Sequence, residues 1–185
     1  MRLLCFGDSN TYGYDPHSYF GDRYPADVRW ADLLAQETGW EVQNAGMNGR
    51  MIPTAPTVRL PDADVLVVML GSNDLLNGYS AQETAARMER FLSQAGSCCP
   101  HILLVAPPPM KYGDWAADER LLAESARLAA HYRALARQLG IWFADAGDWN
   151  VELTFDGVHF SQAGHRTFAS GLRQALLNQQ ENIAP

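Results

Sequence analysis

The chain has 185 residues, of which 47% are hydrophobic and 19% are charged, and its formal net charge is −7 at pH 7. This composition is typical of one globular domain, which we expect to span residues 1–185, and it excludes a disordered chain. With 14 Lys and Arg against 21 Asp and Glu and no basic run, nucleic acid is not an expected partner. No apolar run is long enough for a signal peptide or a membrane span, so we expect a cytoplasmic protein without a membrane partner.

The first element is an apolar strand over residues 3–6, which leads directly into the turn Gly7-Asp8-Ser9. Gly7 permits the tight backbone path with which such a strand ends, and open α/β sheets place their sites at the carboxyl ends of strands. Ser9 is therefore a candidate nucleophile. The same residues also suit an ordinary turn, or a helix start capped by Ser or Asp.

The rest of the chain alternates apolar runs with helical patterns, which predicts βαβ units and a parallel sheet. Loops with aromatic residues and with Gly or Pro, expected over residues 14–28 and 111–117, are placed to shape a substrate site. We expect strands over residues 41–44, 65–70, 102–106 and 141–144, and helices over residues 30–37, 81–94, 121–139 and 162–177.

Polar residues follow three of these later strands. The segment Asn44-Ala45-Gly46-Met47-Asn48-Gly49-Arg50 contains two glycines that bring backbone N–H groups close to a bound group, although a loop without chemistry has the same pattern. Gly71-Ser72-Asn73-Asp74 follows the most apolar strand, and Asp156-Gly157-Val158-His159 follows the last strand. All of these segments are expected at the same edge of the sheet as Ser9.

Acyl transfer by a serine requires a base, a group that orients the base, and donors for the developing oxyanion. His159 is the candidate base, and Asp156, three residues before it, is the candidate orienting carboxylate. The Ser9 N–H, the Gly46 N–H and the Asn73 side-chain amide are the candidate oxyanion donors. No metal or cofactor is required for this chemistry.

Together, the segments that contain Ser9, Gly46, Asn73 and the pair Asp156 and His159 resemble the four motif blocks of the SGNH hydrolases, also called GDSL-type esterases and lipases. The resemblance covers the whole chain. It implies an α/β fold, a three-layer α/β/α sandwich of the flavodoxin-like type with a central parallel sheet of about five strands. It also implies the nucleophile, triad and oxyanion roles given above. Two positions depart from the family pattern: Asn10 stands where Leu is expected, and Ser72 where Thr is frequent.

The resemblance is strongest to small arylesterases and acetyl-esterases, which implies a serine esterase for short-chain, acetyl-type carboxylic esters. The absence of a long apolar insertion also favours a short acyl group. The expected partner is a small-molecule ester, and some members form homo-oligomers that narrow the pocket between subunits. The residues near the nucleophile that we expect to bind substrate are Asp8, Asn10, Tyr12 and Asn48.

Three alternatives remain at this point. The same mechanism serves thioesterases and lysophospholipases, and fold does not choose among substrates. A catalytically silent carbohydrate-binding module would use aromatic platforms, namely Tyr12, Tyr14, Trp115 and Trp149. A two-metal phosphoesterase would take its ligands from Asp8, Asn73, Asp74 and His159. The three cysteines, Cys5, Cys98 and Cys99, have neither a disulfide framework nor metal-ligand spacing.

Overall fold

The computed structural model describes residues 1–54, 60–95 and 99–181, so Cys98 lies outside the described residues. The strands are β1 (Arg2–Gly7), β2 (Glu41–Gly46), β3 (Val65–Met69), β4 (His101–Ala106) and β5 (Trp142–Asp145). The helices are α1 (Ser9–Tyr12), α2 (Trp30–Thr38), α3 (Ser72–Leu76), α4 (Ala81–Ala95), α5 (Glu119–Leu139), the 3-10 turn η1 (Ala146–Trp149) and α6 (Gln162–Glu181).

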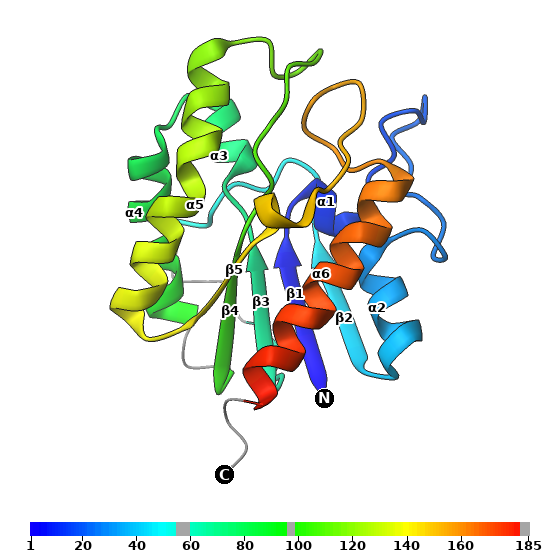
Figure 1. Cartoon of the computed structure of the whole chain (residues 1–185), viewed down its shortest axis with the longest axis vertical. Helices are drawn as coiled ribbons and strands as arrows, with labels where there is room; N and C mark the ends of the chain where they lie inside the picture. Colours follow the sequence, from blue (N-terminus) through cyan, green and yellow to red (C-terminus); the bar gives the residue numbers. More distant parts are fainter. Residues whose placement is uncertain (55–59, 96–98, 182–185) are drawn as a thin grey trace.

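The sheet has the strand order β2-β1-β3-β4-β5, and every neighbouring pair is parallel. This is the doubly wound, flavodoxin-like order, so the predicted fold class is confirmed. The chain order reverses beside β1, whose two neighbours are β2 and β3. All strands point the same way in Figure 1, and the long loops gather at their carboxyl ends. This edge, next to the reversal, is where open α/β sheets bind ligands.

Two hydrophobic clusters cover the two faces of the sheet, because side chains alternate between faces along each strand. The first contains Leu4, Phe6, Leu66, Val68 and Leu104 from the strands and is covered by α4 and α5. The second contains Leu3, Cys5, Val65, Val67 and Leu103 and is covered by α2 and α6. Each fully buried Leu, Val or Phe contributes about 1.5–3 kcal/mol, so both layers hold the sheet edge rigid.

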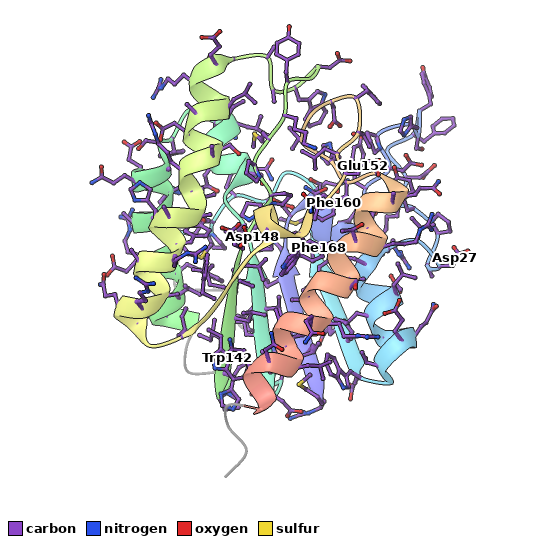
Figure 2. All side chains as sticks on the ribbon, in the orientation of Figure 1. Asp27, Trp142, Asp148, Glu152, Phe160 and Phe168 are labelled. Atoms are coloured by element: carbon purple, nitrogen blue, oxygen red, sulfur yellow. The ribbon has the colours of Figure 1, made fainter. Side chains whose placement is uncertain are left out.

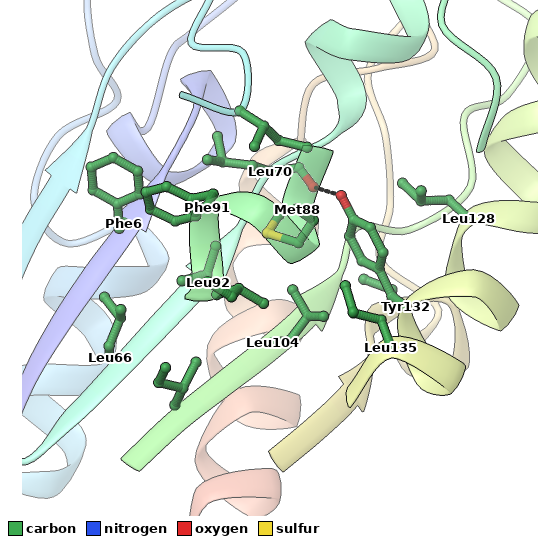
Figure 3. Packing of buried hydrophobic residues seen from close by; sticks show 14 of the residues in the cluster. Phe6, Leu66, Leu70, Met88, Phe91, Leu92, Leu104, Leu128, Tyr132 and Leu135 are labelled. Carbon is green, nitrogen blue, oxygen red and sulfur yellow. Dashed lines mark hydrogen bonds between the residues drawn. The ribbon is translucent and has the colours of Figure 1, made fainter. Parts of the chain in front are cut away.

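Aromatic rings anchor both layers close to the carboxyl edge. Figure 3 shows the α4 and α5 side, where Phe6 stacks on Phe91 with ring centroids 5.4 Å apart. On the same side, the hydroxyl of Tyr132 donates to the carbonyl of Leu70 at 3.0 Å. On the other side, Phe160 packs against Phe168 of α6 with ring centroids 5.2 Å apart (Figure 2).

The long elements follow the sequence predictions to within one or two residues, except that α6 continues to Glu181, four residues beyond its predicted end at residue 177. The other differences are short helices: the turns expected after the first and third strands begin helices α1 and α3, at Ser9 and Ser72. A helix of four or five residues is too short to show periodicity, so the sequence pattern did not reveal it. Ser161 accepts from the Gly164 N–H at 3.0 Å and caps α6 as predicted. Within the described residues, none of the helices is both long and apolar enough to cross a bilayer.

Candidate active site

Ser9 is the first residue of α1 and follows the end of β1 by two residues. Gly7 makes this path feasible, because a Cβ there would lie 2.8 Å from the carbonyl oxygen of Met69 on β3. The carboxylate of Asp8 caps the helix by accepting the Asn10 N–H at 3.0 Å. The N–H of Ser9 has no acceptor among the described residues, so it points free from a helix start, where backbone N–H groups favour negative charge.

Ser9, His159 and Asp156 form a continuous hydrogen-bonded series. The Oγ of Ser9 lies 3.0 Å from Nε2 of His159, and Nδ1 of His159 lies 2.7 Å from Oδ2 of Asp156. A carboxylate only accepts, so Nδ1 carries the proton, and Nε2 of the neutral ring is then an acceptor for the Ser9 hydroxyl. Burial is nearly complete: Ser9 is 7%, His159 2% and Asp156 1% exposed. This arrangement can remove a proton from the serine as its oxygen attacks.

The carboxylate of Asp156 is held by its own loop. Its Oδ1 accepts from the N–H groups of Val158 and His159 at 2.8 and 2.9 Å, and from the hydroxyl of Thr154 at 2.9 Å. Burial by itself would raise the pKa of Asp156, but the hydrogen bonds from His159 and Val158 outweigh it and hold that pKa well below its usual range. Asp156 therefore stays ionised and keeps the imidazole in one tautomer.

Asn10 joins the nucleophile turn to this loop. Its Nδ2 donates to the carbonyl of Val158 at 3.1 Å, and its Oδ1 accepts from the N–H of Phe160 at 2.9 Å, so the amide brackets His159. Asn10 is only 4% exposed, and its carbonyl accepts from the indole N–H of Trp30 at 2.9 Å. Both polar atoms of the Asn10 side chain are bonded to the histidine loop. The predicted substrate-binding role of Asn10 stays a prediction.

A cavity of about 190 Å³ opens beside Ser9 and His159, and Asn48, Gly49 and Asn73 also line it. Two aromatic walls complete it and contact the imidazole: the ring centroids of Tyr14 and Trp115 lie 4.8 and 5.0 Å from that of His159. They come from the two loops that were expected to shape a site.

The predicted oxyanion donors differ in availability. Asn73 lines the cavity and donates one amide hydrogen to the carbonyl of Arg50 at 3.1 Å, which leaves the second free. The N–H of Gly46 is already bonded to Oδ1 of Asn44 at 2.9 Å. Gly46 instead allows close packing, because a Cβ there would lie 2.1 Å from the backbone N of Tyr12. Gly49 lines the cavity, has a φ of +70°, and its N–H has no acceptor among the described residues.

Other residues singled out in the sequence lie off the cavity wall. Asp8 is 1% exposed beneath the nucleophile turn, and burial raises the pKa of its carboxyl to about 6. The ring of Tyr12 is covered by the guanidinium of Arg23 at 4.4 Å. Trp149 packs against Phe168 of α6, with centroids 5.2 Å apart, away from the nucleophile. Of the four predicted substrate-binding residues, the structure brings only Asn48 to the cavity lining.

Asp74, a metal ligand in the two-metal alternative, is fully buried, and both of its carboxylate oxygens accept hydrogen bonds. Its Oδ1 accepts from Nε of Arg87 at 2.7 Å, and its Oδ2 accepts from the N–H of Ile52 at 3.0 Å. Across the described ranges, no group of three or more His, Cys, Asp or Glu side chains is arranged to hold a metal ion.

Comparison with known proteins identifies the family. The sequence profile of the GDSL-like lipase/acylhydrolase family matches residues 5–167. The chain belongs to this family. The Mycobacterium smegmatis aryl esterase structure is 30% identical and has a TM-score of 0.79 over 96% of this chain and 98% of that one. A putative arylesterase from Agrobacterium tumefaciens is 29% identical, with a TM-score of 0.81 over 96% and 99% of the two chains.

A carbohydrate acetylesterase family member from Sinorhizobium meliloti is similar to the same degree, with 29% identity and a TM-score of 0.81 over 95% of this chain and 97% of that one. No curated protein sequence matches this chain significantly. The GDSL-type enzyme described here is thus a carboxylic ester hydrolase of the SGNH fold that acts on a small-molecule ester.

Both glycines of the segment after β2 are expected from the sequence to bring backbone N–H groups close to a bound group, but Gly46 and not Gly49 is the predicted donor. Arg50, in the same segment, has no predicted role. The signal that separates Gly49 from Gly46 is the side chain of Asn44, which folds back onto the Gly46 N–H. No sequence pattern points to Arg50, because two of the residues that it contacts, Gly7 and Asn73, lie far from it in the chain.

Proposed function

We propose that this enzyme hydrolyses short-chain esters, acetyl esters first, through an acyl-enzyme on Ser9. The observation that carries the proposal is the hydrogen-bonded series of Ser9, His159 and Asp156 at the wall of a small cavity. A serine whose hydroxyl faces an oriented, neutral imidazole is an activated nucleophile.

In the proposed reaction, Nε2 of His159 takes the Ser9 proton as Oγ bonds to the acyl carbon. The oxyanion collapses, the bond to the alcohol breaks, and the imidazolium returns its proton to the departing alcohol. Water then enters, gives a proton to His159, and releases the carboxylic acid while Ser9 regains its proton. Asp156 stays ionised throughout and stabilises the imidazolium.

For the oxyanion we propose three donors: the Ser9 N–H, the free amide hydrogen of Asn73, and the Gly49 N–H in place of the Gly46 N–H. All three residues line one cavity, and neither backbone N–H has an acceptor among the described residues. Gly46 would first have to break its bond to Asn44. A crystal structure of a phosphonate adduct on Ser9 tests this: the phosphonyl oxygen is expected within about 2.7–3.1 Å of the Gly49 nitrogen.

Cavity size supports a short acyl group. Its volume of about 190 Å³ is below the range of roughly 300–1,000 Å³ typical of drug-sized ligands. The rings of Tyr14 and Trp115 form two of its walls, so a long acyl chain would have to displace an aromatic side chain.

A second cavity next to the first has polar side chains that favour an ester with a polar leaving alcohol. This cavity of about 210 Å³ shares Trp115 with the first, and its lining combines three leucines with the aromatic and charged side chains of Tyr79, Asp118, Arg120 and Glu124. The aromatic and charged side chains offer a stacking face and hydrogen-bonding groups to a sugar. Acetylated carbohydrates are therefore our second candidate substrate class, tested by comparing kcat/KM for an acetylated xyloside and phenyl acetate.

The central experiment is hydrolysis of p-nitrophenyl acetate, butyrate and octanoate by wild type and Ser9→Ala, with a chelator present. We expect wild type to prefer acetate and Ser9→Ala to lose at least about 10⁴-fold in kcat. A mutant that keeps its rate would refute the nucleophile assignment. A preference for octanoate would refute the short-acyl proposal and favour a lysophospholipase.

Homo-oligomerisation also stays a proposal. Several aromatic side chains at the rim are more than half exposed, namely Tyr19, Phe20, Tyr112, Trp115 and Phe155. A second subunit on this rim would cover them and narrow the cavity entrance. Light scattering on wild type and a Tyr19→Ser, Phe20→Ser double variant tests the proposal, and a monomeric wild type would refute it.

A further inference from the structure

One side chain, that of Arg50, contacts the backbone near the carboxyl ends of two neighbouring strands, β1 and β2. Its Nη1 donates to the carbonyl of Gly7 at 2.9 Å and also to the carbonyl of Ala45. Gly7 lies two residues before Ser9, and Ala45 lies at the end of β2, where the glycine-containing segment begins. Arg50 therefore fixes the distance between the two segments that carry the proposed backbone donors.

The backbone of Arg50 makes the third connection. Its carbonyl accepts the Asn73 amide at 3.1 Å, which orients that side chain toward the cavity. Its own N–H donates to the carbonyl of Met47 at 3.2 Å and closes the turn that presents Asn48 and Gly49. Arg50 is therefore connected to all three proposed donors. Asn73 is bonded to it directly, Gly49 precedes it in the chain, and Ser9 lies two residues after Gly7, whose carbonyl it holds.

Arg50 is itself held on both sides. Its guanidinium lies over the ring of Phe6 at 4.2 Å, and Phe6 stacks on Phe91 of α4. Two residues further on, the Ile52 N–H donates to Asp74 at 3.0 Å, and Arg87 bridges Asp74 to the Ile52 carbonyl. The segment after Arg50 is therefore fixed to the residue next to Asn73.

We propose that Arg50 is the positioning residue of the oxyanion hole, a role that rests on the proposed function. Oxyanion donors act only when they lie about 2.7–3.1 Å from the developing charge. A displacement of about 1 Å costs on the order of a hundredfold in rate. A guanidinium suits this role because it donates several hydrogen bonds in fixed directions while its face stacks on an aromatic ring.

The test compares Arg50→Met and Arg50→Lys with Arg133→Met. Arg133 is the matched control, because it also stacks on a ring, Phe143 at 5.1 Å, and donates to Asp145 at 3.3 Å, beside β5. We would measure kcat and KM for p-nitrophenyl acetate, and the Kd of an aryl trifluoromethyl ketone, which forms a tetrahedral adduct with a serine. Fluorophosphonate titration of Ser9 normalises every rate to the number of active sites.

For Arg50→Met we expect kcat per site to fall about a hundredfold and KM to change less than threefold. The ketone affinity should fall by the same factor as kcat/KM, because both measure the oxyanion. Arg50→Lys, which still donates but cannot stack, should lose about tenfold, and Arg133→Met should match wild type. A purely structural arginine would lower the number of titrated sites and leave kcat per site unchanged.

Two results would overturn the inference: wild-type kcat per site in Arg50→Lys and Arg50→Met, or a loss of kcat without any loss of ketone affinity. If Arg50→Met does not fold, Arg50→Lys decides by the same criteria. A wild type without esterase activity would overturn the proposed function, and this inference with it. An active wild type with unaffected Arg50 variants would overturn the inference alone.

Discussion

The two sides of the nucleophile are built differently. On the histidine side, one short loop supplies both Asp156 and His159, and the bonds that orient Asp156 come from residues two or three positions away. On the oxyanion side, the candidate donors come from three segments at Ser9, Gly49 and Asn73. Their contacts cross 23 to 43 residues, as between Asn73 and Arg50 and between Arg50 and Gly7.

This difference indicates what each side depends on. The histidine loop orients its own carboxylate locally and is joined to the nucleophile turn through Asn10, so defects on this side should appear in proton transfer. The oxyanion side depends on side chains that join separate segments, so its defects should appear in kcat while the proton transfer groups remain intact. Substitutions on the two sides separate these effects.

The largest effect is expected on the histidine side, from Asp156→Asn. The amide can no longer hold His159 in the required tautomer, so kcat for p-nitrophenyl acetate should fall about 10⁴-fold, as in serine proteases with the same change. Asp148→Asn, at an exposed carboxylate of η1, is the matched control and should keep its activity. A loss below tenfold would show that Asp156 does not orient the base.

On the oxyanion side, Asn73→Ala should lower kcat by about 10²-fold and leave KM nearly unchanged, because one charge-stabilising donor is lost. Asn178→Ala on α6 serves as the control. The pH dependence of kcat/KM should keep its wild-type shape, since His159 and Asp156 are untouched. A shifted pH profile in Asn73→Ala would contradict the separation of the two sides.

A smaller effect is expected from Asn10→Leu, which restores the residue common in the family. The change leaves the Val158 carbonyl and the Phe160 N–H without their partner, at a cost of about 1–3 kcal/mol in unfolding free energy for each buried group. We expect about a tenfold loss of kcat per titrated site, because the loop around His159 loosens. Equal kcat per site in both proteins would show that the loop keeps its position without Asn10.

The smallest effect concerns stability rather than rate. Burial lowers the pKa of His165 from 6.5 to about 3 and raises that of Asp8 from 3.8 to about 6. Below pH 6.5 His165 binds a proton in the unfolded chain before it does so in the folded chain, so the free energy of unfolding decreases as the pH is lowered. Between pH 6 and 4 the folded chain protonates Asp8 first, so stability rises as pH falls. The two effects oppose each other in this window.

Urea unfolding at pH 4, 5 and 6 tests this balance. His165→Leu should become more stable on acidification and Asp8→Asn less stable, each by up to about 1.4 kcal/mol per pH unit relative to wild type. The neighbours that influence the pKa of His165, namely Arg29, Asp15 and His159, stay in both variants. Identical slopes in all three proteins would refute the pKa directions given for these groups.

Much of the fold could be predicted because its long elements have strong local patterns. Val65–Met69 is an unbroken apolar run and is completely buried, and Trp30, Leu33 and Leu34 have the spacing of one helix face. The family resemblance supplied the flavodoxin-like fold class, and the strand order itself comes from the structure, because periodicity does not say which strands are neighbours. Short helices such as α1 lack any periodic signal.

The site was predictable to the extent that its residues are close in sequence. The three-residue spacing of Asp156 and His159 is readable, whereas the choice between Gly46 and Gly49 depends on where the Asn44 side chain turns. Arg50 and Asn10 owe their positions to contacts that cross 43 and 148 residues. No local pattern contains such information, so the contacts of these two residues emerge only from the folded chain.

Ser9 and His159 lie 150 positions apart in the sequence, so the assembly of the site also reports on folding. Contacts between distant residues form late, because closing a long loop is entropically costly. The first strand and its serine leave the ribosome long before the last loop does, so a nascent chain cannot hydrolyse an ester. After dilution from urea, the return of activity will therefore report when residues 153–160 dock beside the turn that carries Ser9.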